Sequence, residues 1–271
     1  MQDYFLQKTA PSTSCLYYSV RRLPYKQQRR IILIHALYRN LLSVLFDCQE
    51  VGVARTKLQW WRDQVLRMSQ GKAQHPILIE LQDCLDLTTC QDLIFEMING
   101  IDSYLDEPLF MKEADLYHYF AKTAGARELI ILKNENDKDQ PELANFAYNV
   151  GGAIELIHQI RNIYQYIRKG HFLFTQADLD RCHVELKDFH QFNLTPQVRD
   201  FLSLQAQKAR QYYSQAWQTS VDLTKNLQGY YRRYTDLYLK TLQVIEQQNY
   251  AVLDQYIKLN PLNKLFRTIF I

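Results

Sequence analysis

The chain has 271 residues, of which 47% are hydrophobic and 23% are charged, and its formal net charge at pH 7 is +3. Its 8 glycines and 7 prolines are too few for a turn-rich β-sandwich or a flexible multidomain chain. Because the net charge is small, bulk electrostatics give no reason to expect a nucleic-acid partner.

The cysteines are odd in number and contain no CxxC pair, which excludes a simple disulfide framework and a typical structural zinc site. They are Cys15, Cys48, Cys84, Cys90 and Cys182. The N-terminal residues lack the basic start and apolar run of a secretory signal. No stretch approaches eighteen uninterrupted apolar residues. We therefore expect a cytoplasmic protein, either soluble or bound peripherally at the inner face of a membrane.

Helical periodicity is found along the whole chain, and strand alternation is absent. Residues 26–48 are apolar on most sides, which indicates a buried helix. Residues 53–70 carry an amphipathic pattern that Gly71 closes. Further helices are expected from Pro76, over 89–105, 112–133 and 142–169, from Thr195 to about Asn226, and over 229–248, with a shorter pair at the C-terminus. The stretch 133–142 reads as a polar loop and 171–194 as irregular. The pattern predicts an all-α protein with one domain.

Several short stretches occur in the order typical of one enzyme family. They are LPYKQQRRIILIHALYR, KLQWWRDQV followed by HPI, INGIDSYL, YFAKTAGA, NVGGAIELIHQIRN and the tyrosine-rich C-terminal helices. With these stretches the chain resembles the squalene/phytoene synthases over nearly its whole length. The resemblance implies an isoprenoid synthase-like helical bundle around a central cavity, with residues 1–271 forming one squalene/phytoene synthase-like domain.

The family joins two allylic diphosphates, so the resemblance implies Mg²⁺ at the leaving diphosphate. Magnesium is a hard cation that prefers oxygen ligands, usually carboxylates together with phosphate and water. Carboxylates four residues apart share one face of a helix, and two facing motifs can therefore hold a metal cluster. In the family the first motif reads R-x-x-D-D-x-x-D. The second ends a run of the form Q-x-x-N-x-x-R-D-x-x-x-D.

The first motif of this chain keeps its arginine and lacks its acids. Arg39 matches the leading arginine, and the aspartate positions hold Leu42, Ser43 and Phe46. No carboxylate occurs anywhere in residues 25–46. The sequence therefore predicts a first-motif helix that cannot bind Mg²⁺ through carboxylates.

The second motif is changed in the same way. Arg161 is kept, whereas Asn162 and Tyr166 replace the two aspartates. Glu155 stands at the glutamine position and His158 at the asparagine position. The family acid that follows the Asn-Gly pair is also replaced, by a tyrosine at 104. We accordingly assign no catalytic residue and no metal ligand, and interpret these positions as a former site.

Acids elsewhere could in principle have taken over the metal. Those near the motif segments are Asp47, Glu50, Asp102 and Glu155. Asp47 lies one residue past the first motif and should point away from it. Glu155 and His158 share a helix face with the second-motif positions, but one carboxylate and one imidazole make a poor Mg²⁺ site. We expect these two side chains to hydrogen-bond each other, because buried polar groups need partners.

Two functions remain. The favoured hypothesis is a catalytically degenerate family member, a pseudoenzyme that acts as a binding or assembly protein with a prenyl- or lipid-type cavity. An aspartate-lacking branch that resembles respiratory complex I assembly factors is the closer match. The alternative is an active head-to-head prenyl transferase that uses diphosphate substrates with an altered metal site. The first needs no cofactor and the second needs Mg²⁺. The expected partners are an isoprenoid or lipid ligand and a protein, with no nucleic acid.

The C-terminal stretch 261–271 could also contact a membrane. It places apolar residues at helical spacing beside Lys264 and Arg267, after a helix-starting Pro261. The apolar residues are Leu262, Leu265, Phe266, Ile269 and Phe270. The basic run Arg21, Arg22, Lys26, Arg29 and Arg30 could face anionic lipid, a diphosphate or only solvent. The competing hypothesis for 261–271 is that it docks onto the protein's own helices.

Overall fold

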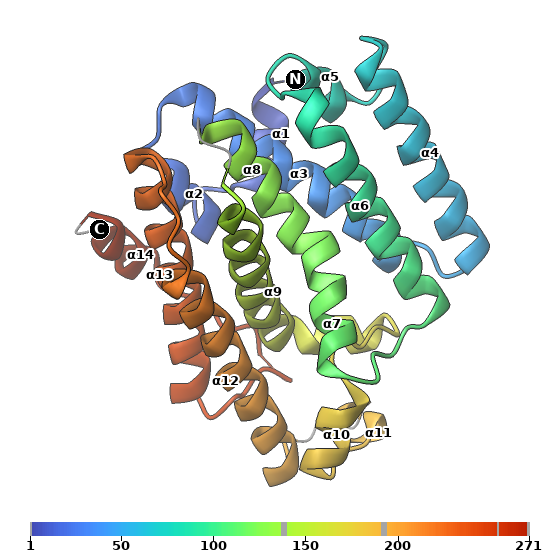
Figure 1. Cartoon of the computed structure of the whole chain (residues 1–271). Helices are drawn as coiled ribbons and strands as arrows, with labels where there is room; N and C mark the ends of the chain where they lie inside the picture. The colour runs from blue at the N-terminus through green and yellow to red at the C-terminus, as the bar shows by residue number, and fades with distance from the viewer. Residues whose placement is uncertain (1, 137–139, 191–193, 254, 270–271) are drawn as a thin grey trace.

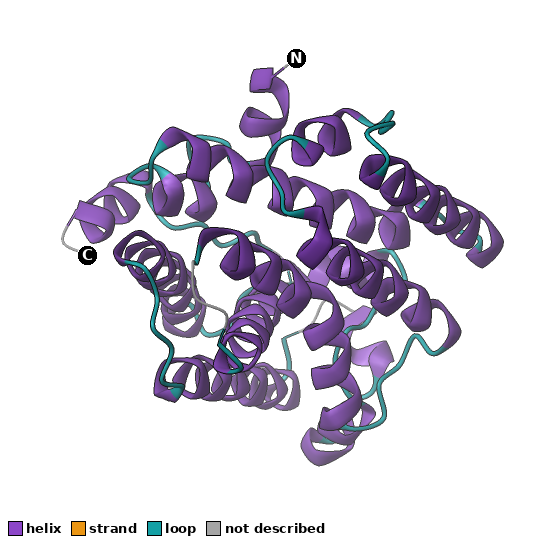
Figure 2. Cartoon of the chain, turned by 45° about the horizontal axis from the view of Figure 1, so that its top comes forward, coloured by secondary structure: helices purple, strands orange, loops and turns teal. Residues whose placement is uncertain are grey.

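The computed structural model describes residues 2–136, 140–190, 194–253 and 255–269. Within these ranges the chain is built of helices and contains no β-strand (Figures 1 and 2), which confirms the predicted all-α class. The only bridge between extended residues there joins Phe110 to Thr175. The helices are α1 (Gln2–Thr9), α2 (Cys15–Val20), α3 (Tyr25–Asp47), α4 (Val51–Ser69), α5 (Pro76–Gln82), α6 (Leu87–Asp106), α7 (Glu113–Phe120), the π-helical turn η1 (Ala121–Gly125), α8 (Ala126–Glu135), α9 (Glu142–Arg168), α10 (Gln176–Cys182), α11 (Leu186–His190), α12 (Pro196–Gln218), α13 (Lys225–Gln247) and α14 (Pro261–Ile269).

The helices α3 and α9 supply much of the buried interior. Every residue from 31 to 38 in α3 is buried, as is every residue from 149 to 157 in α9. A helix that is buried all round needs neighbours on every side. For α9 these neighbours include α8, α12, α13 and η1, and Figure 1 shows α9 running through the middle of the bundle. Both former motifs therefore lie on helices with long buried stretches, although the motif positions themselves are mostly half-buried.

A close approach between α9 and the preceding helical segment explains why residue 151 is a glycine. A Cβ atom on Gly151 would lie 2.7 Å from the backbone carbon of Ala124 and from the backbone nitrogen of Gly125. Only a residue without a side chain fits there. The contact falls on η1, which splits the predicted helix 112–133 into α7 and α8. A single π turn interrupts the regular α-helical hydrogen bonding. Here the interruption lies where the segment packs closely against α9.

Four short helices, α1, α2, α10 and α11, were not predicted, whereas the short helix α5 begins at Pro76 as expected. The chain opens with α1 and α2, and the stretch expected to be irregular, 171–194, contains α10 and α11. Ser14 caps α2 by accepting a hydrogen bond from the amide of Tyr17, and Thr175 caps α10 in the same way. These helices are too brief for a clear apolar period and depend on their caps and on packing.

The C-terminal part differs from its prediction in two places. Helix α12 ends at Gln218, eight residues before the expected end. Of the expected C-terminal pair, the described residues contain one helix, α14, which packs against α2 and α13 (Figure 1). No helix in the described ranges is long and apolar enough to cross a membrane.

Candidate functional site

The two former motifs meet through aromatic side chains. Phe46 on α3 and Tyr166 on α9 form an edge-to-face pair with ring centroids 4.7 Å apart. His171 packs edge-on against Phe46 at 5.0 Å, and Tyr104 of α6 lies 5.8 Å from His171. We call Phe46, Tyr104, Tyr166 and His171 the aromatic cluster. Three of its members occupy positions where the family pattern has an aspartate or another acid.

Two members of the aromatic cluster form hydrogen bonds with backbone groups. His171 donates from Nε2 to the carbonyl of Leu45 at 2.7 Å, because a carbonyl can only accept. The hydroxyl of Tyr104 accepts from the amide of Phe172 at 3.3 Å. Burial raises the pKa of Tyr104 to about 12, and it raises the pKa of Tyr166 well above its ordinary value. Both phenols therefore stay neutral at physiological pH.

These residues do not fit a magnesium cluster. The first motif offers Leu42, the Ser43 hydroxyl, which donates to the carbonyl of Asn40 at 3.0 Å, and the ring of Phe46. The second offers the amide of Asn162 and a neutral phenol, where Mg²⁺ prefers carboxylates. No group of three or more His, Cys, Asp or Glu side chains within the described ranges is arranged to hold a metal ion.

Arg39, the retained arginine of the first motif, contacts the end of another helix. Its Nη1 donates to the carbonyl of Thr9 at 3.2 Å and, more weakly, to that of Lys8 at 3.4 Å. These carbonyls belong to the last turn of α1, where a cation is favoured by the helix dipole. Arg39 therefore ties α1 to α3.

Glu155 is buried and bound by a tyrosine. The hydroxyl of Tyr38 donates to Oε2 of Glu155 at 3.1 Å. Burial raises the pKa of Glu155, while the charge of Arg127 and the Tyr38 hydrogen bond oppose that shift. The Arg127 guanidinium lies 4.6 Å from the centroid of the Tyr38 ring, a cation–π distance. Glu155 is therefore a buried acidic side chain whose hydrogen-bond donor, Tyr38, comes from α3.

His158 is held by a different tyrosine. Its Nε2 lies 2.9 Å from the hydroxyl of Tyr238, and the Asn162 amide donates to its Nδ1 at 3.2 Å. Because Nδ1 accepts, we assign the neutral ring with its proton on Nε2. Burial lowers the pKa of His158 well below its ordinary value, and the charges of nearby arginines lower it further. The expected hydrogen bond between Glu155 and His158 was wrong, since each side chain bonds a tyrosine from another helix.

The remaining nearby acids do not replace the lost ligands. Asp102 accepts from Arg62 at 2.7 Å, and Asp47 lies 3.7 Å from the Lys169 ammonium on the exposed surface. Glu50 precedes α4 without capping it through its side chain. None of these three acids forms a hydrogen bond or an ion pair with Phe46 or Tyr166.

The buried ion pair between Arg127 and Glu128 was not predicted from the sequence. Arg127 and Glu128 are both buried, and Nη2 of Arg127 lies 2.5 Å from Oε1 of Glu128. Tyr231 donates to Oε2 of Glu128 at 3.2 Å. The signal available in the sequence was an Arg-Glu pair inside an otherwise apolar helix, since charged residues are rarely fully buried unless paired.

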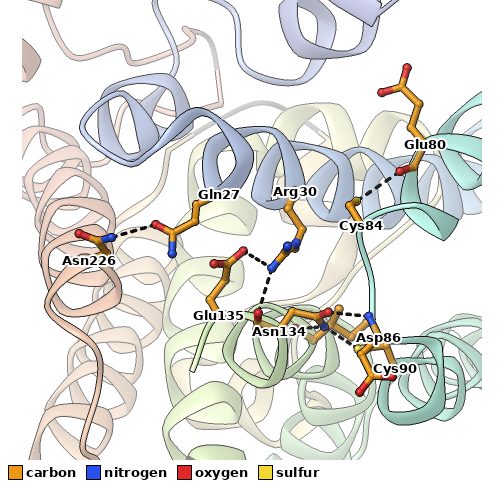
Figure 3. A network of polar contacts seen from close by, with 10 residues as sticks. Gln27, Arg30, Glu80, Cys84, Asp86, Cys90, Asn134, Glu135 and Asn226 are labelled. Carbon is orange, nitrogen blue, oxygen red and sulfur yellow. Dashed lines mark hydrogen bonds and ion pairs between the residues drawn. The ribbon is translucent and has the colours of Figure 1, made fainter. Parts of the chain in front are cut away.

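The basic run near the N-terminus is partly neutralised within the fold. Nη2 of Arg29 lies 2.6 Å from Oε2 of Glu80, and Nη1 of Arg30 lies 2.8 Å from Oε1 of Glu135. Figure 3 shows Arg30 reaching from α3 towards Glu135 and the carbonyl of Asn134 on α8. Arg29 and Arg30 therefore link α3 to α5 and α8 through ion pairs. The exposed positive charge of the run comes from Arg21, Arg22 and Lys26.

Two hollows lie on the outside of the bundle, away from both former motifs. The larger, of about 770 Å³, lies between α7, α9 and α12 and is lined by side chains such as Tyr117, Asn149 and Tyr212. The smaller, of about 360 Å³, lies between α12, α13 and α14 and has Arg210, Asp236 and Arg267 in its wall. None of the former-motif residues lines either hollow.

Comparison with known proteins agrees with this architecture. The family model described as squalene/phytoene synthase matches residues 10–263. The chain is 22% identical over 262 residues to a 15-cis-phytoene synthase of Synechococcus elongatus, covering 91% of this chain and 84% of that enzyme. It is 23% identical to the 15-cis-phytoene synthase of Synechocystis sp., covering 92% of this chain and 77% of that enzyme.

Solved structures show the same fold. A dehydrosqualene synthase in complex with ligand superposes with a TM-score of 0.85 at 17% identity, covering 99% of this chain and 94% of the other. The squalene synthase HpnC from Alicyclobacillus acidocaldarius superposes with a TM-score of 0.76 at 16% identity, covering 92% and 93%. At these identities the likeness establishes the isoprenoid synthase fold.

Proposed function

We propose that this chain, which belongs to the squalene/phytoene synthase family, is a catalytically degenerate member whose 1–271 domain acts as a binding or assembly protein. The observation that carries the proposal is the edge-to-face pair of Phe46 and Tyr166, at 4.7 Å, between the two former metal motifs. Two packed rings stand where two carboxylates would grip a metal-bound diphosphate.

The energetic argument is that family catalysis depends on charge neutralisation at the leaving diphosphate. Without carboxylates there is no oxygen ligand set to hold Mg²⁺, which would supply that neutralisation. Three of the remaining polar groups of the former site are occupied by other partners. Arg39 bonds the end of α1, Glu155 bonds Tyr38, and His158 bonds Tyr238. None of them is left poised as a base or a metal ligand.

The ligand we propose for the interior is an isoprenoid or lipid chain rather than a reacting diphosphate. The curated relatives are phytoene synthases, and a tunnel for such a chain needs apolar and aromatic walls. Side chains of this kind pack around α9, among them the buried Tyr119, Phe120 and Ile154. An assembly role with a protein partner is compatible with the same scaffold.

We further propose that α14 contacts a membrane surface. The helix docks through its polar side: Lys264 donates to the carbonyl of Thr13, and Nη1 of Arg267 bonds Asp236 at 2.8 Å. Leu265 packs against the core, whereas Leu262 and Phe266 face outward and are 61% and 57% exposed. A short helix with an outward apolar face and basic neighbours suits the headgroup boundary. Residues 270–271 of the predicted segment lie outside the described ranges.

The test of the central proposal is a product assay. Purified protein is incubated with Mg²⁺ and either farnesyl or geranylgeranyl diphosphate, and the extract is analysed for squalene- or phytoene-type hydrocarbons. We expect none. The alternative, an active transferase with an altered metal site, predicts a Mg²⁺-dependent product that is lost in an Arg39→Ala, Arg161→Ala double variant, and such a product would overturn the proposal.

A further inference from the structure

The larger hollow on the outside of the bundle is separate from both former motifs. Glu113 and Tyr117 of α7, Asn149 of α9 and Tyr212 of α12 lie in its wall, together with several side-chain amides. Its volume of about 770 Å³ falls within the range of pockets that bind small molecules. We call it the α7–α12 hollow. It is large enough for a small ligand that does not enter the interior.

The charged part of this wall is acidic. Among the described residues that line the hollow, Glu113 is the only one with a charged side chain, and that side chain is 47% exposed. Its Oε1 accepts from the hydroxyl of Tyr212 at 3.0 Å, and its Oε2 pairs with Lys208. The Lys208 ammonium also lies 2.8 and 2.7 Å from the two oxygens of Asp178. In the ion pairs of the described residues, one cation thus serves two carboxylates, and the balance at this wall is negative.

Two tyrosine rings give the hollow faces that attract cations. The ring centroids of Tyr117 and Tyr212 lie 5.7 Å apart, with their planes inclined by 40°. Tyr117 is half-buried, so part of its ring is open to a ligand. The face of a phenol ring attracts an ammonium group within about 6 Å. Burial raises the pKa of Tyr212, and the neighbouring charge of Glu113 raises it further, so this phenol stays neutral.

Asn149 supplies an acceptor without a donor. Its side chain is 3% exposed, and its Nδ2 donates to the carbonyl of Asn145 at 2.9 Å and to Oδ1 of Asn145 at 2.7 Å. Both partners are acceptors, which assigns the orientation of the Asn149 amide. Its Oδ1 is buried and has no hydrogen-bond partner. A buried acceptor of this kind is costly to leave unpaired, so the wall gains from a ligand that donates.

We propose that the α7–α12 hollow binds an organic ammonium ion of the polyamine class. An ammonium group has three N–H donors, no acceptor and one positive charge. These properties match the unpaired Oδ1 of Asn149, the carboxylate of Glu113 and the ring face of Tyr117. Gln211 and Gln215, four residues apart on one face of α12, add amide oxygens along the wall. A row of acceptors favours an extended ligand with more than one ammonium group.

This site goes beyond the proposed function, because none of its residues belongs to either former motif. An anion would be repelled by the carboxylate in the wall, and a neutral polyol would use the amides without gaining from that charge. The formal net charge of the chain is +3, so bulk electrostatics do not attract a polycation. Saturable binding of a polyamine would therefore have to come from a local site.

The first arm of the test measures binding of spermidine to the full chain by calorimetry at pH 7 and low salt. The variants are Glu113→Gln, which removes the charge, and Tyr117→Leu, which removes the ring. Glu246→Gln is the matched control, because Glu246 also forms an ion pair, with Arg210, and lines the smaller hollow. We expect one saturable site whose affinity falls about tenfold in each of the two hollow variants and is unchanged in the control.

The second arm repeats the titration with maltose, a neutral polyol. The proposal is overturned if the wild type does not bind spermidine, if either hollow variant binds it as tightly as the wild type, or if Glu246→Gln loses as much affinity as they do. Maltose that binds more tightly than spermidine would assign the hollow to neutral ligands and would also overturn it. Melting curves check that each variant folds. If Tyr117→Leu does not fold, the half-exposed Glu113→Gln decides the outcome alone.

Discussion

Phe46 and Tyr166 show how single residues can remove candidate metal ligands. Each replaces an acid by a ring, and the two rings then pack on each other and on His171. Apolar contacts of this kind stabilise a fold without a ligand, whereas facing carboxylates repel each other until a cation binds. Under the proposed function, the replacements remove both the candidate metal ligands and the repulsion that a bound cation would offset.

Restoring the acids tests that exchange. The variant combining Leu42→Asp, Phe46→Asp, Asn162→Asp and Tyr166→Asp should lower the unfolding free energy of the metal-free protein by about 3 kcal/mol, through desolvation and repulsion. Mg²⁺ should recover part of the loss, because it binds only the folded site. Thermal melts with and without Mg²⁺ measure both effects.

The control for that variant is Phe46→Leu combined with Tyr166→Phe, which perturbs packing without adding charge. Its melting temperature should not respond to Mg²⁺. A metal-free quadruple variant that melts at the wild-type temperature would contradict the packing account of Phe46 and Tyr166.

Glu155 predicts a pH dependence of stability. Because burial raises its folded pKa above the ordinary carboxyl value of 4.5, the folded state holds the proton more tightly than the unfolded state. The penalty for ionising Glu155 is absent below the unfolded pKa, grows as pH rises towards the folded pKa, and is complete above it. Glu155→Gln should therefore raise the melting temperature at pH 7 and lose that advantage at pH 4.

The comparison variant for this prediction is Glu96→Gln, since Glu96 is exposed on α6. It should show no such pH-dependent difference. Melting curves from pH 4 to 8 measure the effect. The opposite result would be a Glu155→Gln variant that is destabilised relative to the wild type, with a larger loss at pH 7 than at pH 4. The ionised Glu155 would then stabilise the fold, and the upward shift of its pKa would be wrong.

The residues of the former site were identified from sequence spacing, whereas their partners were not. The positions of Arg39, Phe46, Glu155, His158 and Tyr166 follow from the motif order alone. Their contacts come from elements far away in the chain, such as α1 for Arg39 and α13 for His158. A side chain's hydrogen-bond partner depends on tertiary packing, so spacing along one helix wrongly paired Glu155 with His158.

At the scale of helices, the long elements were predicted, and among the short ones only those opened by a proline, α5 and α14, were. The apolar period of α3, α4 and α9 extends over many turns, and their observed ends lie within two residues of the prediction. Helices such as α2 and α11 have one or two turns, too few for a period, and depend on caps and neighbours. The π turn in the predicted helix 112–133 arises beside Gly151, a contact that no local pattern encodes.

Arg39 gives a prediction about α1. Because Arg39 donates to the last carbonyls of that helix, Arg39→Ala should loosen α1 by about 1 kcal/mol and leave the rest of the bundle unchanged. Hydrogen exchange followed by mass spectrometry should become faster in the first ten residues only. Arg39→Lys, which keeps the charge, should show a smaller change. Equal acceleration throughout the protein would instead assign Arg39 a role in the core.

Helix α14 gives a prediction about membranes. Removing its outward apolar side chains with Leu262→Ser and Phe266→Ser should abolish flotation with anionic vesicles, because each buried side chain contributes about 2 kcal/mol. The melting temperature should stay unchanged, since both side chains are exposed. Met111→Ser, which removes an equally exposed apolar residue next to α10, is the control. If the wild type stays with the soluble fraction at low salt, the membrane contact is refuted.

At the scale of the whole molecule, the family scaffold is kept while the acids expected in its two motifs are replaced. The TM-score of 0.85 with a dehydrosqualene synthase at 17% identity shows how far the fold outlasts the sequence. A bundle of this kind is stabilised by helix packing, which tolerates many apolar replacements. The proposed function needs only the replacement of a few carboxylates, which leaves the packing intact.

The most direct test of the account is calorimetric binding of a non-reactive farnesyl diphosphate analogue, with Mg²⁺ and with a chelator. Family catalysis requires that Mg²⁺ strengthen binding of the diphosphate, because the metal links it to the motif carboxylates. For this chain we predict that the affinity, whatever its value, is the same in both conditions. Saturable binding that appears only with Mg²⁺ would contradict the loss of the metal site.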